Sequence, residues 1–186
     1  MQMVSILADA ITIREDIVRL HVIANSDSQA DQVLKLEVRD TVLSYLQPLV
    51  EEAAGKEQAE ACIQKNLSEI ERIAEIKLVS LGKEMTVRAT YGPEEYGKRE
   101  YDTFCLPSGV YDSLRIELGA AEGKNWWCVV FPSLCLPAAG ENFQSAAVSA
   151  GFGQDLTDTL SQHNGYQVRF FFLDILGKLE NFLHFS

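Results

Sequence analysis

The stretch that decides the fold is IVRLHVIANSDSQADQVLKLEVRD, residues 17–40. Its first eight residues are mostly apolar and β-branched, which predicts a partly buried strand over 17–24. In the polar segment that follows, Ser26 precedes Gln29 by three residues and Ser28 precedes Asp31 by three. Both spacings fit a helix cap. The stretch therefore predicts a strand that leads directly into a helix.

Two amphipathic helices are predicted after this strand. Apolar residues recur every three or four positions from residue 31, which predicts a core-facing helix that Pro48 bends or ends. The same period returns from about residue 56 and stops at Gly82, whose freedom at positive φ suits a helix end. The two helices are expected to pack together as a hairpin.

The period then changes to two, which predicts strands. A polar loop is expected over 92–98, a hairpin connection over 119–125, and a helix within 140–161 that its glycines weaken. The expected strands are 85–90, 101–106, 110–118, 126–131 and 166–171, and a closing helix is expected over 173–183. The sequence thus predicts an α+β fold, an antiparallel sheet packed against a helical hairpin and a C-terminal helix.

Composition fits one folded domain over residues 17–186. The chain has 186 residues, of which 47% are hydrophobic and 23% charged, as in ordinary folded proteins. Residues 1–16 are expected to be an N-terminal segment whose signal or anchor was trimmed or lies upstream, because there is no basic start and Asp9 interrupts the apolar run.

Charge and motifs argue against several classes of function. A net charge of −11 repels phosphate backbones, so nucleic acid is not an expected partner. No His or Cys cluster has metal-ligand spacing, and the glycines of GAAEG at 119–123 precede a β-rich run and not a helix that could hold phosphate. We therefore expect no metal, no cofactor and no small-molecule substrate.

One catalytic arrangement remains open from the residues alone. Cys128, His21 and Asp27 are the parts of a thiol-dependent hydrolase or transferase, although nothing in the sequence brings them together. Cys128 and Cys135 are close enough in sequence to form a bridge if the chain doubles back, or both are buried thiols. A passive module that binds cell-wall material through exposed aromatic residues is a third possibility.

The only two tryptophans lie side by side, at Trp126 and Trp127. Neighbouring residues of a strand point to opposite faces of its sheet, so at least one ring is expected in the core. The other is either covered by a helix or exposed, and an exposed indole is a candidate for partner binding.

Two segments resemble the stage II sporulation protein R family. They are residues 17–40, quoted above, and residues 106–135, LPSGVYDSLRIELGAAEGKNWWCVVFPSLC. The NWWC run followed by FPSLC is the more specific of the two, and IANSD supports it independently. The sequence departs from the family pattern at Ala121 and Ser133, which bears on loop geometry.

The resemblance implies a non-enzymatic signalling protein of endospore formation. It would be exported from the forespore into the space between forespore and mother cell. There it would activate a membrane-embedded aspartic protease that cleaves the precursor of a mother-cell sigma factor. An oxidising compartment favours a disulfide between Cys128 and Cys135.

The resemblance also selects the candidate residues for partner binding. Asn125, Trp126 and Trp127 come first, and His21, Asn25 and Asp27 come next. All six belong to the two segments that carry the resemblance.

Overall fold

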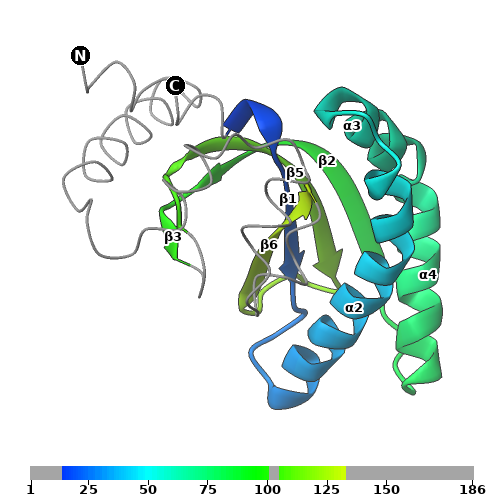
Figure 1. Ribbon diagram of the computed structural model, residues 1–186. Coiled ribbons are helices and arrows are strands. Elements are labelled where there is room, and N and C mark those ends of the chain that lie inside the picture. The colour runs from blue at the N-terminus through cyan, green and yellow to red at the C-terminus, as the bar shows by residue number, and fades with distance from the viewer. Residues whose placement is uncertain (1–13, 101–104, 133–186) are drawn as a thin grey trace, which may run out of the picture. The chain divides into compact units, whose positions relative to one another are not determined.

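The computed structural model describes residues 14–100 and 105–132 (Figure 1). By its internal contacts the chain divides into two compact units, and most of the described residues, 18–92 and 113–131, belong to one of them. The other unit contains the described residues 14–17, 93–100, 105–112 and 132. The prediction of a single domain over 17–186 extends beyond the described residues and stays a prediction.

A four-stranded sheet is the centre of the fold. Its order is β2 (Val87–Tyr96), β5 (Gly109–Leu118), β1 (Val18–Ile23) and β6 (Asn125–Phe131). All six residues of β1 are buried, as expected for a strand with neighbours on both sides. The α+β class is thereby confirmed, and the strands predicted near 17–24, 110–118 and 126–131 are present.

Two predictions about the sheet were wrong. The sheet is mixed and not wholly antiparallel, because β1 runs parallel to β5 and antiparallel to β6. In addition, β5 and β6 do not form a hairpin, since β1 lies between them. Strands adjacent in sequence are neighbours in a sheet only about two-thirds of the time. Here β1, all of whose residues are buried, takes a central place, where both of its edges are covered.

The prediction of a polar loop over 92–98 was also wrong in large part. Strand β2 continues through Gly92 and Pro93 to Tyr96. Proline is tolerated there because β2 is at the end of the strand order, where a missing N–H costs no ladder bond. A second, two-stranded sheet follows, formed by β3 (Arg99–Glu100) and β4 (Cys105–Leu106).

Three helices lie between β1 and β2 in the chain: α2 (Gln29–Glu51), α3 (Lys56–Lys65) and α4 (Leu67–Ser80). The second predicted helix is thus two helices, separated at Asn66. Pro48 lies inside the last turn of α2 and does not end it. Gly82, at φ 75°, terminates α4 as predicted, with its N–H bonded to Val79 and that of Lys83 bonded to Leu78.

Helices α2 and α4 lie side by side and cover one face of the sheet (Figure 1). Their buried residues recur at helical spacing and form the core with the inward residues of β1, β5 and β6. Helix α4 also covers the edge of β2, where Glu71 accepts a hydrogen bond from the Ala89 N–H at 2.8 Å. The strand predicted at 166–171 and the closing helix at 173–183 lie outside the described residues. In the part of the chain that is described, no helix combines the length and apolar character needed to cross a membrane.

Candidate functional site

The loop at residues 119–124, here called the crossing loop, passes over the end of β1. It has to do so because β5 and β6 flank β1 and the loop connects them. Its backbone is bonded to the residues that follow β1: the Gly123 N–H donates to Ala24 O at 2.9 Å and the Glu122 N–H to Asn25 O at 3.2 Å. The two segments that carry the family resemblance therefore meet here.

The Asn25 side chain ties the crossing loop to helix α2. Its Oδ1 accepts a hydrogen bond from the Ala120 N–H at 3.0 Å, and its Nδ2 donates to Asp31 Oδ2 at 2.8 Å. The contact is close enough that a Cβ added at Gly119 would collide with the Asn25 amide, and Gly119 has a φ of 57°. Glycine is therefore required at this position for both space and backbone conformation.

The Asp31 carboxylate is the common acceptor for the side chains of Asn25 and Ser26. Besides the bond from Asn25, its Oδ2 accepts one from Ser26 Oγ at 2.5 Å, while its own N–H donates to the N-cap Ser28 Oγ at 3.1 Å. The hydrogen bonds from Ser26 and Asn25 lower the pKa of the Asp31 carboxyl below its ordinary value. Asp31 is thus held as a carboxylate, the form that accepts these bonds.

Two side chains of opposite charge hold the backbone of Lys124, one at its N–H and the other at its carbonyl. Asp27 Oδ1 accepts from the Lys124 N–H at 2.7 Å, and Lys35 Nζ donates to the Lys124 carbonyl at 2.9 Å. Lys35 also donates to Gln32 Oε1 at 2.7 Å and is buried, which lowers the pKa of its ammonium group. This arrangement fixes the residue that precedes β6 and its two tryptophans.

The two tryptophans lie on opposite faces of β6, as the sequence predicted. The Trp126 ring is 4.7 Å from the guanidinium carbon of Arg39 on α2, on the helix-covered face. The Trp127 ring is stacked on His21, with 5.5 Å between ring centroids and 26° between planes. His21 and Trp127 are also register partners across β1 and β6. Both rings are half-buried.

All six candidate residues lie in the unit formed by residues 18–92 and 113–131, around the crossing loop and β6. Asn25 and Asp27 use their side chains to hold the loop, whereas Asn125 is exposed at the start of β6. The sequence predicted Asp31 at the helix cap and in a favourable pair with Lys35, and it predicted Gly123 only as part of a hairpin connection. It did not identify Arg39, or the contacts of Lys35 and Gly123 with the rest of this junction. A lysine and an aspartate four residues apart on a helix normally indicate a surface pair, so nothing local signalled these contacts.

The thiol-enzyme arrangement is not assembled. Cys128 and His21 point to opposite faces of the sheet, because Cys128 is paired with Leu20 while His21 is paired with Trp127. Asp27 is bonded to Lys124, and the buried Cys128 sulfur is disulfide-bonded. Cys135 lies outside the described residues, so its pairing with Cys128 stays a prediction. Among the residues described, no group of His, Cys, Asp and Glu is placed to hold a metal ion.

The fold and the site define a class: a mixed α+β domain in which a strand-to-helix junction clamps a loop that crosses a buried strand. A family model and a relative of known name agree on the family to which this chain is similar. Residues 14–141 match the family model for stage II sporulation protein R. A relative from Bacillus subtilis (strain 168), named stage II sporulation protein R, is 34% identical over 125 residues.

The chain belongs to the stage II sporulation protein R family. The match with the Bacillus relative covers 67% of this chain and 56% of the relative's length. No solved structure matches this chain.

Proposed function

We propose that this protein is an extracytoplasmic signal of endospore formation. It is exported from the forespore and activates a membrane-embedded aspartic protease, which then processes the precursor of a mother-cell sigma factor. Family membership is the observation that carries the proposal. The family and the relative are named for a stage of sporulation and not for a reaction, in keeping with a regulator.

The partner-binding surface in this proposal is the face of β6 that carries Trp127. Asn125 and Trp127 are two residues apart and therefore share this face, and His21 lies beneath the Trp127 ring. Arg115, the register partner of His21 on β5, adds a half-exposed guanidinium bonded to Glu117. An aromatic ring bordered by hydrogen-bonding and charged groups is typical of a protein-binding surface.

Asn25, Asp27, Asp31 and Lys35 have an indirect role in this proposal. They fix the crossing loop and so set the position at which Asn125 leaves it. A protein activates a partner only if it binds the active state more tightly than the inactive one. A rigidly placed strand end makes such discrimination possible, because a misplaced contact loses its binding energy.

Reconstitution in a host that does not form spores tests the function. The chain, carrying an export signal, is produced with the protease and the sigma precursor, and precursor cleavage is followed by immunoblot. We expect cleavage only when all three proteins are present. Cleavage that does not depend on this chain, or no cleavage with all three, contradicts the proposal.

Two matched variants test the surface separately. Asn125→Lys changes an exposed side chain on the proposed face, and Gln64→Lys makes the same charge change at an exposed position of α3. We expect the first to reduce cleavage at least about tenfold and the second to have no effect. Equal cleavage by both variants would place the partner surface elsewhere and leave the proposed function intact.

A further inference from the structure

A disulfide lies in the middle of β6, at Cys128. The Cys128 sulfur is disulfide-bonded, and the residue is only 2% exposed. Cys62 on α3, by contrast, is a free thiol and only half-buried. Surface oxidation would reach the more accessible thiol first. The bond at Cys128 therefore belongs to the fold.

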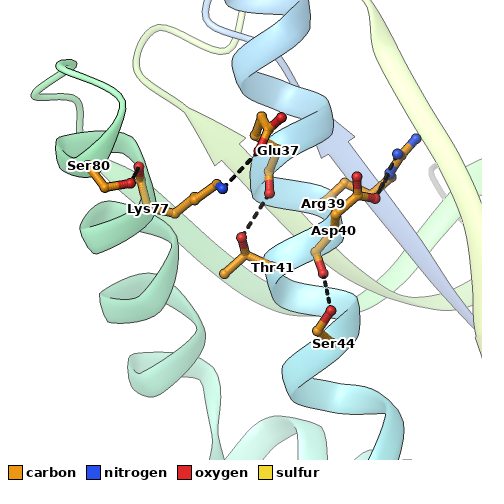
Figure 2. A network of polar contacts seen from close by, with 7 residues as sticks. All are labelled: Glu37, Arg39, Asp40, Thr41, Ser44, Lys77 and Ser80. Atoms are coloured by element: carbon orange, nitrogen blue, oxygen red, sulfur yellow. Dashed lines mark hydrogen bonds and ion pairs between the residues drawn. The ribbon is translucent and has the colours of Figure 1, made fainter.

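Helix α2 covers the face of β6 on which Cys128 lies. Cys128 is the register partner of Leu20, which is fully buried in β1. Trp126 comes two residues earlier and shares this face, where its ring lies 4.7 Å from the guanidinium carbon of Arg39. Figure 2 shows Arg39 on α2, with the hydrogen bond of 2.7 Å from its Nε to Asp40 on the same helix. The bonded sulfur is thus on the inner face of the sheet, beneath α2.

The burial of this sulfur controls when the bond can form or break. Thiol–disulfide exchange begins when a thiolate attacks one sulfur of the bond, so its rate depends on access to that sulfur. Cys128 offers no such access while β6 is paired with β1 and covered by α2. Oxidation is limited in the same way, because it passes through a mixed disulfide between the cysteine and the oxidant. The bond therefore forms before this part of the chain is fully packed, and it persists afterwards.

We propose that the Cys128 disulfide makes folding of this chain conditional on an oxidising compartment. As the bond forms, two thiols of the chain lose two electrons and two protons to a protein disulfide oxidant, which becomes a dithiol. The bond restricts the unfolded chain and so shifts the equilibrium toward the folded state. A chain kept in a reducing compartment stays short of its fold, whereas an oxidised chain is locked in it.

A consequence for signalling rests on the proposed function. The partner surface proposed above is on β6, where Trp127 directly precedes Cys128. In a reduced chain β6 is not locked in place, so this surface is presented only after the chain has been exported and oxidised. The disulfide thus confines the active form of the signal to the far side of the membrane.

Thiol labelling of the full chain tests whether the bond is enclosed. The oxidised protein is incubated with dithiothreitol, with and without unfolding concentrations of urea, then quenched in acid, unfolded and alkylated, and mass spectrometry identifies the labelled cysteines. Cys62 is labelled in every sample and is the internal standard. We expect reduction at Cys128 to be at least about 100-fold slower without urea than with it. Equal rates, or a Cys128 thiol that is labelled without any reductant, would overturn the proposal.

Urea denaturation followed by tryptophan emission tests whether folding depends on the bond. Both tryptophans lie within two residues of Cys128. We expect reduction to lower the equilibrium constant for folding at least about 30-fold, and Cys128→Ser to behave like the reduced chain without any reductant. Cys62→Ser is the matched control and should keep the stability and the redox dependence of the wild type. A reduced wild-type chain as stable as the oxidised one would overturn the proposal, whether or not Cys128→Ser folds.

Precursor cleavage in the reconstituted host separates this inference from the proposed function. We expect exported Cys62→Ser to support full cleavage and exported Cys128→Ser to reduce it at least about tenfold. Full cleavage with Cys128→Ser would overturn the inference and leave the proposed function intact. No cleavage with the wild type would contradict the proposed function, whereas the labelling and denaturation results decide the redox dependence of folding on their own.

Discussion

Two regions of the unit formed by residues 18–92 and 113–131 are opposite in character. One is the crossing-loop junction, residues 24–31 and 119–124. The other is the set of exposed apolar residues on α2, on α4 and at the end of α4, here called the helix-pair patch: Val33, Leu36, Ile76, Val79 and Leu81. The junction is polar and joined by hydrogen bonds, and it contains the residues that identify the family. The patch is apolar and exposed. The difference teaches that residues within the segments that carry the family resemblance can serve the fold, since Asn25 and Asp27 use their side chains to hold the crossing loop.

The largest effect is expected at Gly123. A Cβ at this position would collide with the backbone of Ser26 and lie 2.9 Å from the Ala24 Cβ. Because backbone must move, Gly123→Ala should lower the free energy of unfolding by about 3 kcal/mol. Gly97→Ala is the control, since its Cβ would meet nothing within 4 Å. Urea denaturation compares the two, and similar losses would mean that the junction is not tightly packed.

Asp31→Asn should have the next largest effect. The change removes the charge that accepts from Ser26 and Asn25, so we expect a loss of about 2 kcal/mol in the free energy of unfolding at pH 7. The folded protein lowers the pKa of Asp31 below 3.8, so its stabilisation is present above that pH and is lost as the pH falls further. The difference between wild type and variant should therefore shrink in urea denaturation at pH 3. A difference independent of pH would contradict this role.

Lys35→Met should have a smaller effect on stability and a specific effect on fluorescence. It removes the donor to the Lys124 carbonyl, at an expected cost of about 1 kcal/mol. The chain has only two tryptophans, both within three residues of Lys124, so their emission spectrum reports the position of the strand end. We expect a shift in emission for this variant and none for Lys65→Met, whose lysine is exposed on α3. Identical spectra would show that Lys35 does not position the strand.

The smallest effect on stability is expected in the patch. Val79→Ser should change the free energy of unfolding of the monomer by less than about 0.5 kcal/mol, because the side chain is already 58% exposed. Its buried neighbour in α4 gives the contrast: Leu78→Ala should cost about 3 kcal/mol. Thermal unfolding at low protein concentration measures both. A large loss for Val79→Ser would mean that the patch belongs to the core.

The sequence predicted more of the fold than of the site. The strand at 17–24, the capped helix after it and the strands at 110–118 and 126–131 follow from periodicity, because alternating burial imposes periods of two and 3.6 on the residues themselves. The same reasoning placed Trp126 and Trp127 on opposite faces. It failed for the break at Asn66, which lies within a continuous apolar period.

What the sequence determined by itself is the family, the α+β class and most element positions, since these depend on local pattern. Only the tertiary structure decided the order of the strands and, with it, the structural role of residues such as Asn25 and Asp27. Local sequence cannot show that β1 enters between β5 and β6, because strand order depends on contacts between segments about 100 residues apart. Once β1 is central, the loop must cross it, and Asn25 and Asp27 become the groups that hold the loop.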